Sequence, residues 1–579
     1  MIEYNIVYIT KMIQTRRIFR TLCTKHQNLF VFLFLAVLVA ISCYGVFSLH
    51  FLNDEWIQLG YIYKFGIFGE FTHNISVLEI LSGKGRLFGG LLNNIFFSTF
   101  WYNPIPFVVF GITFHLVNSY LVYLVTMEIL RKKRMAIITA AVFSVPATAH
   151  QALSWLAATV QTVGSMTFVL LSVLIAIRGI KTKNIRFAIA SWILAYIALL
   201  FKESSFFVFP ILLILPYFID TKVKKRIRWV SMLGVILLLF VIGYTKFIFF
   251  WRIPNSESLL PQTFFAFLRS GINFIWYPLV SLGQFFIPSQ FMLRLSVVFS
   301  HSVYPSFKNL TEGNQIVNFI VTDLVSILAS FVVILFQVYI YVKRGYYRKY
   351  LLLAAIWYVL TFGPISIFLY NRNNSYIESR YLYYSFFAIA MIVGITIEAL
   401  ISALYSFFKN RSTALVLTIV VFSVFMVKQV SLLRREIRQN IIYGNDITLV
   451  MTEVKHVFPK IPAKPIFFVD GDRTFFLTNT HFPLQLGPGY MLMMAYAPSP
   501  NVSTDLLGMN YLCGLTDQGY TEVNEKGYGY FFDKDKLLRL FQTDKSLSSD
   551  QIVGMYYYGN DRRLIDITQT IREYVDRYR

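Results

Sequence analysis

Long apolar runs recur along the first three quarters of this chain, and they exclude an ordinary water-soluble fold. Hydrophobic residues make up 56% of the 579 residues, and charged residues only 14%. A helix needs about 20 apolar residues to cross a hydrocarbon layer about 30 Å thick. Runs of roughly that length lie near residues 29–52, 104–127, 135–150, 156–178, 187–202, 204–219, 229–251, 319–342, 350–370, 383–407 and 413–430. We therefore expect a mainly α polytopic membrane helix bundle with about 11 spans.

Clusters of Lys and Arg separate successive pairs of these runs. They lie at Lys11–Lys25, Arg131–Arg134, Arg178–Arg186, Lys222–Arg228, Lys343–Lys349, and Lys409 with Arg411. Basic residues in short loops are retained on the cytoplasmic side of a membrane. The pattern predicts a cytoplasmic N-terminus and an extracytoplasmic region that begins at about Arg434. We expect an integral, multi-pass membrane protein, located in the plasma membrane if the chain is prokaryotic.

The formal net charge of +23 does not indicate a nucleic-acid partner. Basic and acidic residues are about balanced between Arg434 and Arg579, so the excess of basic residues lies in the membrane region. Cytoplasmic loops in contact with anionic membrane lipids account for that excess. The three cysteines, Cys23, Cys43 and Cys513, imply no intrachain disulfide framework, because only one of them lies in the outer region.

Composition divides the chain into three parts. They are a cytoplasmic segment (1–28), a transmembrane domain (29–433) with outer loops at 53–103 and 252–318, and an extracytoplasmic domain (434–579). In the first outer loop, apolar residues at helical spacing between Leu87 and Ile95 predict a short helix in the membrane interface. The second outer loop is rich in aromatic residues and prolines, and we expect it to form a lid or a re-entrant segment.

The C-terminal region has the composition of an aqueous domain, and we expect a small α/β fold. Residues 466–469, 470–472 and 474–476 have the pattern of strand, turn and strand, and 564–578 has helical periodicity. Asp470 and Asp472 also match the DxD metal site of soluble sugar transferases. An Asp-Gly pair between two β-rich runs is more often a hairpin turn, which is the interpretation we favour.

Two adjacent carboxylates, Asp54 and Glu55, lie where the first apolar run leaves the membrane. A carboxylate close to hydrocarbon is costly, which makes it a candidate for function. A structural role is also open: Asn53 is suited to cap a short helix that includes Trp56, and carboxylates stabilise the first turn of such a helix. The two roles are compatible with each other.

Further polar residues lie at the outer ends of the expected spans. They are Arg86, His115, Lys202, Glu203, Glu378 and Arg380. A transferase that uses a lipid-phosphate sugar donor needs fixed cations for the departing phosphate and a carboxylate for the acceptor proton. Each residue also has a purely structural interpretation. These are an ion pair of Lys202 with Glu203, an interface pair of Glu378 with Arg380, an interhelical hydrogen bond of His115, and a headgroup contact of Arg86.

The order of these motifs resembles that of a known superfamily. The matching segments are Asn53-Asp54-Glu55-Trp56, Gly85-Arg86-Leu87, Phe114-His115-Leu116-Val117-Asn118, Ala198-Leu199-Leu200-Phe201-Lys202-Glu203-Ser204, and Glu378-Ser379-Arg380-Tyr381-Leu382-Tyr383. They resemble the GT-C superfamily of polyprenyl-phosphate-sugar-dependent glycosyltransferases over about residues 29–430. The resemblance is greatest to the membrane part of the transmembrane and tetratricopeptide-repeat O-mannosyltransferases and their prokaryotic relatives.

The resemblance implies a role for each matched residue. It places catalysis on Asp54, with Glu55 as its neighbour or substitute, and donor-phosphate contacts on Arg86, Lys202 and Arg380. His115, Glu203, Glu378 and Tyr381 are implied as supporting residues. The chain departs from the family where Leu87 replaces a frequent proline after the arginine. An α/β domain also replaces the tetratricopeptide tail.

The activity implied is transfer of a hexose, such as mannose, from a polyprenyl phosphate to a hydroxyl of a glycan, lipid or protein acceptor. Transfer would take place on the extracytoplasmic side, by direct displacement and with inversion. No metal ligands are predicted; a divalent metal is compatible with this chemistry but not indicated, and no other cofactor is implied.

Two other classes of function remain open at this point. A transporter or lipid flippase also places polar groups within spans, although such proteins commonly have paired halves and this sequence shows no convincing internal duplication. A scaffold whose outer domain binds cell-surface polymer is the third interpretation. Turnover of a lipid-linked sugar, movement of a substrate across vesicles, and activity without residues 434–579 distinguish the three.

Overall fold

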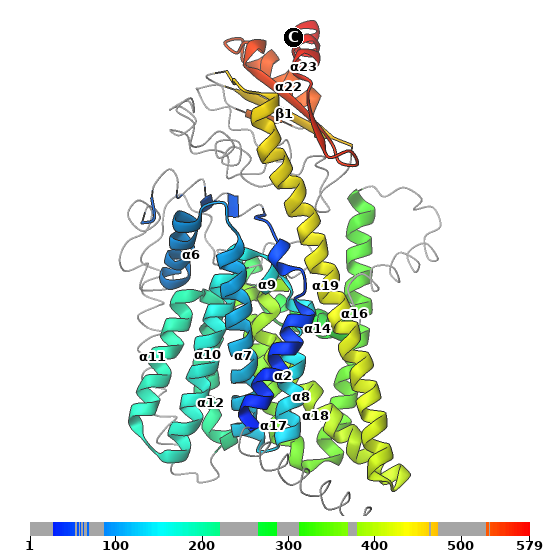
Figure 1. Ribbon diagram of the computed structural model, residues 1–579. Coiled ribbons are helices and arrows are strands. Elements are labelled where there is room, and N and C mark those ends of the chain that lie inside the picture. The colour runs from blue at the N-terminus through cyan, green and yellow to red at the C-terminus, as the bar shows by residue number, and fades with distance from the viewer. Residues whose placement is uncertain are drawn as a thin grey trace, which may run out of the picture.

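The structure is a computed structural model in which a helical bundle carries a small sheet at one end (Figure 1). It describes residues 27–52, 55, 56, 58, 59, 62, 66–68, 86–219, 264–286, 312–368, 379–462, 465–472, 529–531 and 533–579. The one long helix α19 connects the bundle to the sheet domain (Figure 1).

The structure describes the following helices of the bundle, in chain order. They are α2 (Gln27–Ser42), η1 (Val46–Ser48), α6 (Leu87–Phe100), α7 (Ile105–Leu130), α8 (Lys133–Phe143), η2 (Ala147–Ala149), α9 (Gln151–Ser154), α10 (Leu156–Thr182), α11 (Ile185–Phe201), η3 (Glu203–Phe207), α12 (Val208–Ile219), α14 (Phe264–Phe286), α16 (Glu312–Lys343), η4 (Gly345–Tyr347), α17 (Arg348–Phe368), η5 (Ser379–Leu382), α18 (Tyr383–Phe408) and α19 (Arg411–Val457).

Six helical segments of the described chain are long and apolar enough to cross a membrane. They are Ile105–Leu130, Leu156–Thr182, Thr322–Lys343, Gly345–Ser366, Ser379–Phe408 and Arg411–Val457. Shorter apolar helices occur at Gln27–Ser42, Leu87–Phe100, Ile185–Phe201 and Glu203–Ile219. A helical membrane bundle is therefore confirmed, whereas the expected total of about 11 spans is not.

Some expected spans are shorter in the structure than in the sequence pattern. The first apolar run forms α2 only as far as Ser42, and the chain turns at Gly45, whose φ of 95° suits glycine. The run at 135–150 forms α8 and η2, and Pro146 lies between them because a proline removes a helical N–H donor. In contrast, the helix expected between Leu87 and Ile95 is confirmed as part of α6.

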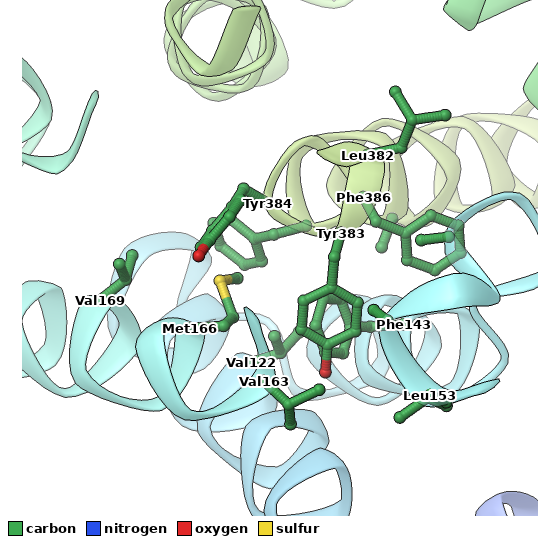
Figure 2. Packing of buried hydrophobic residues seen from close by; sticks show 14 of the residues in the cluster. Val122, Phe143, Leu153, Val163, Met166, Val169, Leu382, Tyr383, Tyr384 and Phe386 are labelled. Atoms are coloured by element: carbon green, nitrogen blue, oxygen red, sulfur yellow. The ribbon is translucent and has the colours of Figure 1, made fainter. Parts of the chain in front are cut away.

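Helix α10 lies at the centre of the bundle, whereas α16 and α19 lie at its periphery. In its most apolar window 83% of α10 is buried within the protein, against 17% for α16 and for α19. The exposed side chains on these peripheral helices are large and apolar, as Leu335 and Val424 illustrate, so they form a surface suited to lipid. Figure 2 shows the buried packing of α18 against α8 and α10, in which Tyr383 and Phe143 lie side by side.

Four of the basic clusters gather at one end of the bundle, called here the basic-turn end. It holds the turns between α7 and α8, α10 and α11, α16 and α17, and α18 and α19 (Figure 1). The ammonium of Lys132 lies 4.3 Å from the ring centre of Tyr346, which brings two of these turns together. The clusters at Lys11–Lys25 and Lys222–Arg228 lie outside the described residues.

The structure differs from the expected outer loop at 252–318. Helix α14 lies in this region and packs within the bundle: the Tyr358 hydroxyl of α17 donates to the Pro278 carbonyl at 2.8 Å. Phe285 packs on Phe386 of α18 with ring centres 5.3 Å apart. Helix α16 also begins at Glu312, inside the expected loop.

Helix α19 runs for 47 residues without a break, so the expected boundary at 433/434 falls inside a helix. Its first half exposes apolar side chains. Its second half, called here the stalk (residues 434–457), extends from the bundle to the sheet domain (Figure 1). Arg434 lies where the stalk begins, and its guanidinium donates to the Ile41 carbonyl near the end of α2.

The C-terminal domain contains a four-stranded sheet in the order β2-β1-β3-β4. Its strands are β1 (Ile466–Gly471), β2 (Gly529–Phe531), β3 (Ile552–Tyr558) and β4 (Arg563–Asp566). Strand β1 pairs in parallel with β2 and β3, and β3 pairs antiparallel with β4. Strand β1 continues through Asp470 and Gly471, where a turn was expected, and the expected second strand of the hairpin, 474–476, lies outside the described residues.

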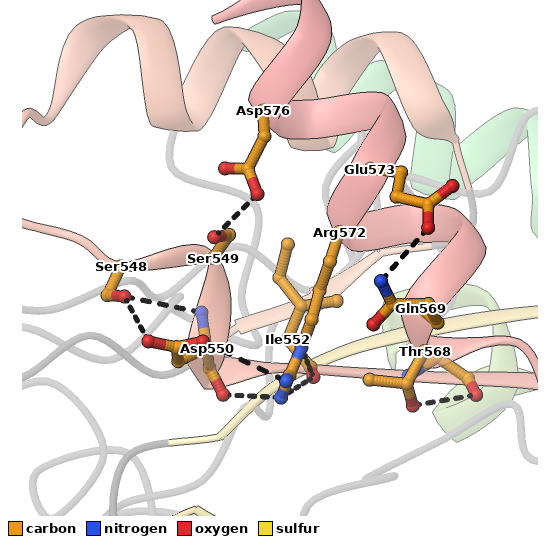
Figure 3. A network of polar contacts seen from close by, with 10 residues as sticks. Ser548, Ser549, Asp550, Ile552, Thr568, Gln569, Arg572, Glu573 and Asp576 are labelled. Carbon is orange, nitrogen blue, oxygen red and sulfur yellow. Dashed lines mark hydrogen bonds and ion pairs between the residues drawn. The ribbon is translucent and has the colours of Figure 1, made fainter.

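The end of the chain was also expected to be helical from Leu564. The structure has β4 there, and helix α23 begins at Thr568. Helices α22 (Lys534–Thr543) and α23 (Thr568–Tyr578) pack on one face of the sheet through Phe541 and Val575. Figure 3 shows how polar contacts support this packing: Arg572 of α23 donates to the carbonyl oxygens of Asp550 and Ile552.

Candidate functional site

The candidate site forms around the first two turns of α10, at the end of the bundle opposite the basic-turn end. Trp155 precedes this helix in an extended conformation, with φ of −109° and ψ of 97°. Segments α9, η3 and α6 contact α10, and η5 contacts α9. The sequence reasoning placed its candidates on these separate segments, and α10 is the element that links them.

Arg86 is held by a carboxylate and an amide. Its Nε and Nη2 atoms donate to both oxygens of Glu203 at 2.7 and 2.8 Å, and Nη1 donates to Gln161 Oε1 at 2.5 Å. This two-pronged arrangement is one that arginine makes and lysine cannot. It joins the start of α6 to η3 and to α10.

The backbone of Arg86 is in the left-handed region, with φ of 51°. A non-glycine residue in this region stores strain that the surrounding contacts must offset. Nearby, Gly89 lies so close to the Phe201 carbonyl that no larger residue would fit without movement. The start of α6 is therefore fixed tightly against the end of α11, and the guanidinium of Arg86 has a defined direction.

Lys202 lies in the break between α11 and η3. Its extended backbone, with φ of −160°, ends α11 and turns the neighbouring side chains of Lys202 and Glu203 toward different partners. Lys202 Nζ donates to Thr162 Oγ1 at 2.6 Å and lies 5.2 Å from the ring centre of Tyr381. Lys202 is only 2% exposed, so its cation is buried among these groups.

Arg380 reaches the same region from η5. Its guanidinium carbon lies 4.5 Å from the ring centre of Trp155 and 5.4 Å from that of Tyr381. The ring of Tyr381 therefore lies near the cations of both Lys202 and Arg380. Segment η5 is held in place by α9, because the Gln151 N–H donates to Ser379 Oγ at 3.0 Å.

Glu55 is fully buried and binds backbone amides. Its carboxylate accepts the N–H of Ala157 at 3.1 Å and the N–H of Leu52 at 2.7 Å. Ala157 is in the first turn of α10, where helix N–H groups have no partner within the helix and the dipole favours a negative charge. The contacts of Glu55 thus give it a capping role, and its expected catalytic role stays a prediction.

Two expected site residues, Asp54 and Glu378, lie outside the described residues. Asp54 directly precedes Glu55 in the chain, and Glu378 directly precedes Ser379. Both are therefore adjacent in sequence to residues that contact the start of α10 or α9. Their roles stay predictions.

His115 makes interhelical hydrogen bonds, which was one of its two interpretations. Nε2 lies 3.2 Å from the Ser144 carbonyl, which only accepts, so the ring proton is on Nε2. The Tyr383 hydroxyl then donates to Nδ1 at 2.7 Å, and Asn118 donates to the same hydroxyl. This buried network joins α7, α8 and α18.

Four residues of the cluster were missed by the sequence reasoning: Gln151, Trp155, Gln161 and Thr162. A signal for them exists, because polar residues are rare in the first turns of an apolar helix and costly to bury without partners. Gln161 and Thr162 are adjacent, and their side chains bind Arg86 and Lys202 respectively. The cluster combines the cations Arg86, Lys202 and Arg380 with the carboxylates Glu55 and Glu203. No group of three or more metal-ligating residues occurs in the part of the chain that the structure describes.

Comparison with known proteins gives limited information. No known protein-family profile matches the chain. No curated protein matches it either. Two solved structures of oligosaccharyltransferase from Archaeoglobus fulgidus, the first of them named AglB, are similar to it at 13% identity. One, in complex with an inhibitory peptide and a dolichol-phosphate, has a TM-score of 0.40, and the other, in the apo form, has 0.39. The matches cover 77% of this chain but only 62% of those chains.

Proposed function

We propose that this chain is an integral membrane glycosyltransferase of the GT-C type. It takes a sugar from a polyprenyl phosphate and transfers it to an acceptor hydroxyl on the extracytoplasmic side of the membrane. The observation that carries this proposal is the group of three cations that separate segments bring to the start of α10. Their charge exceeds that of the two carboxylates among the same described residues, so the cluster suits an anionic ligand.

The three cations act on the phosphate of the donor. Arg86 comes from the start of α6, Lys202 from the break after α11, and Arg380 from η5. Negative charge grows on the phosphate as the sugar leaves, and fixed cations in a water-poor site stabilise that charge without reorganising. Thr162, Gln161 and the aromatic rings hold the cations in place before the donor binds.

Asp54 acts as the base. As its carboxylate takes the hydroxyl proton, the acceptor oxygen bonds to the anomeric carbon. The bond between that carbon and the phosphate oxygen breaks, and its electron pair leaves on the polyprenyl phosphate. A single displacement of this kind inverts the anomeric centre. Glu55 positions this base, because its carboxylate binds the adjacent loop to the first turn of α10.

The proposed orientation follows from the distribution of charge. The basic-turn end faces the cytoplasm, as the retention of Lys and Arg on that side requires. The site and the sheet domain then face the extracytoplasmic side. In this arrangement residues 29–433 form the catalytic membrane domain, and residues 434–579 form the outer domain that the stalk carries.

The test is a turnover assay on the purified full-length protein. The protein is incubated with a panel of polyprenyl-phosphate sugars and candidate hydroxyl acceptors, and release of polyprenyl phosphate and transfer of sugar are both measured. We expect transfer with at least one donor, a loss of about 100-fold in Arg380→Ala, and wild-type turnover in Arg438→Ala, an exposed stalk arginine. Movement of the lipid-linked sugar across vesicles without release of polyprenyl phosphate would contradict the proposal and indicate a flippase.

A further inference from the structure

A second polar and aromatic surface lies on the sheet domain, apart from the site at α10. The strand register places Asp470 of β1 beside Tyr556 of β3, and Tyr556 beside Ile565 of β4. Residues opposite one another in neighbouring strands share a face of the sheet, and the face repeats every second residue. Tyr558 and its partner Arg563 therefore lie on this same face.

The three consecutive tyrosines of β3 alternate between the two faces of the sheet. Tyr557 is buried toward the stalk, where its hydroxyl donates to Asp446 Oδ1 of α19 at 3.1 Å. Tyr556 and Tyr558 point to the other face, with ring centres 4.8 Å apart and planes inclined by 58°. Tyr558 is 38% exposed and Tyr556 is half-buried, so the pair presents an aromatic surface. Anchoring of the middle residue fixes the direction of the two outer ones.

Helices α22 and α23 cover only part of this face. They pack on Phe468 and Ile552, nearer the beginnings of β1 and β3. Asp470, Tyr556 and Tyr558 lie further along the same strands, toward their carboxyl ends. In open α/β sheets the carboxyl ends of parallel strands are where ligands bind.

Two carboxylates are fixed beside the tyrosines. Asp472 Oδ1 accepts the N–H of Gly559 at 2.6 Å, just after β3 ends, and Asp470 Oδ1 accepts the N–H of Gly471 at 2.8 Å. The pKa of the Tyr556 hydroxyl is raised, first by burial and then by the charges of Asp470 and Asp472. Because Asp470 is the register partner of Tyr556 and Asp472 binds the residue that follows Tyr558, both carboxylates lie at the same end of the sheet as the tyrosine pair.

We propose that this surface, the tyrosine–aspartate face, binds carbohydrate and holds the glycan acceptor of the transfer reaction. It comprises Asp470, Asp472, Tyr556, Tyr558 and Arg563. The inference rests on the proposed function, because it names the class of its acceptor. A sugar ring has an apolar face of C–H groups that stacks on a tyrosine and a rim of hydroxyls that donate to carboxylates.

Other occupants fit this surface less well. A lipid chain or an apolar helix would leave two carboxylates and a guanidinium against apolar groups, which is costly. An anionic ligand would meet Asp470 and Asp472. A neutral, hydroxyl-rich ligand satisfies the carboxylates through hydrogen bonds and needs the rings for contact area.

The experiment measures binding of neutral sugar chains to the full-length protein in detergent, without any lipid-linked donor. The probes are fluorescently tagged neutral hexose oligosaccharides of two to six units, read by anisotropy. We expect saturable binding to at least one of them, weakened about tenfold by Tyr558→Ala and by Tyr556→Ala, and largely kept by Tyr558→Phe, which retains the aromatic ring.

The chain offers a matched control in Tyr578→Ala. Tyr578 of α23 is 54% exposed and also pairs with another tyrosine, Tyr574, at 5.1 Å between ring centres. This variant should bind like the wild type. Absence of saturable binding, equal binding by Tyr558→Ala and wild type, or binding of a tagged peptide panel in place of the sugars would each overturn the proposal.

The carbohydrate-binding proposal and the glycosyltransferase proposal can be contradicted independently of each other. Arg380→Ala is expected to lose sugar transfer and keep oligosaccharide binding, whereas Tyr558→Ala is expected to weaken oligosaccharide binding about tenfold. Binding without any transfer activity would leave the carbohydrate surface in place and contradict the enzyme proposal alone.

Discussion

The two ends of the bundle carry positive charge in different ways. At the basic-turn end most of the cations are exposed, and their partners are single carboxylates, tyrosine faces or backbone carbonyls, as in the pairs of Arg134 with Glu398 and of Lys132 with Tyr346. At the start of α10 the cations are held by side chains: Lys202 is 2% exposed, and Arg86 is paired through two hydrogen bonds. Burying a cation costs several kcal/mol unless contacts with its partners offset that cost. The arrangement at the start of α10 therefore indicates function, whereas the exposed cations of the basic-turn end suit a membrane surface.

The largest effect is expected at Asp54, which directly precedes the buried Glu55 in the chain. Asp54→Asn keeps the shape of the side chain but removes its basicity, so sugar transfer should fall by about 10² to 10⁴-fold. The measurement is kcat for transfer from a polyprenyl-phosphate sugar. Asp561→Asn, in the exposed turn before β4, is the control and should retain wild-type turnover. Wild-type kcat in Asp54→Asn would remove the base from the proposed mechanism.

A matched pair of arginines then tests the comparison between the two ends. Arg86→Lys loses the two-pronged contact with Glu203, and kcat should fall by about 100-fold. Arg134 also pairs with a glutamate, Glu398, at 3.1 Å, and its side chain is 43% exposed against 37% for Arg86, but it lies at the basic-turn end. Arg134→Lys should change kcat by less than about twofold.

Equal losses of kcat in the two variants would show that neither end is specialised. A loss in Arg134→Lys alone would reverse the comparison and place the chemistry at the basic-turn end.

An intermediate effect is expected at Glu55. Glu55→Ala leaves the N–H groups of Ala157 and Leu52 without their acceptor, which costs about 1 to 2 kcal/mol of stability and lowers the Tm. Glu55→Gln keeps one acceptor oxygen and should lose less. Both variants should also reduce kcat, because the loop that carries Asp54 loses its connection to α10. A Tm equal to that of the wild type in Glu55→Ala would contradict the capping role.

The smallest effect on turnover is expected at Lys132. Lys132→Ala should leave kcat in detergent unchanged and should weaken association with anionic lipid by about 1 kcal/mol. Reconstitution in bilayers with graded anionic lipid content measures both quantities. A large loss of kcat in detergent would mean that the basic-turn end does more than contact the membrane.

The sequence predicted the bundle well because hydropathy and basic turns are local signals. Runs such as 156–178 became helices, and the clusters at Arg131–Arg134 and Arg178–Arg186 lie at one end. It missed α14, whose Pro278 and polar residues weaken the apolar signal. That helix is stabilised by packing: the Trp276 indole donates to Asp323 of α16 at 3.1 Å, a contact between residues far apart in the chain.

The site shows the same division between local and long-range information. Arg86, Lys202 and Arg380 could be selected because a cation beside an apolar run is conspicuous. Their partners could not, because Gln161 and Thr162 are ordinary residues until the fold brings segments 40 or more positions apart into contact. The sheet order was also beyond local patterns, since β1 pairs with strands from the end of the chain.

The central claim is that the three cations at the start of α10 bind the phosphate of the lipid donor. The most direct measurement is the Kd of the purified protein for polyprenyl phosphate alone, in wild type, Lys202→Met and the stalk control Arg438→Ala. The account predicts that Lys202→Met weakens binding by at least about tenfold while Arg438→Ala binds like the wild type. Equal Kd values for Lys202→Met and wild type, in a folded variant of unchanged Tm, would contradict it.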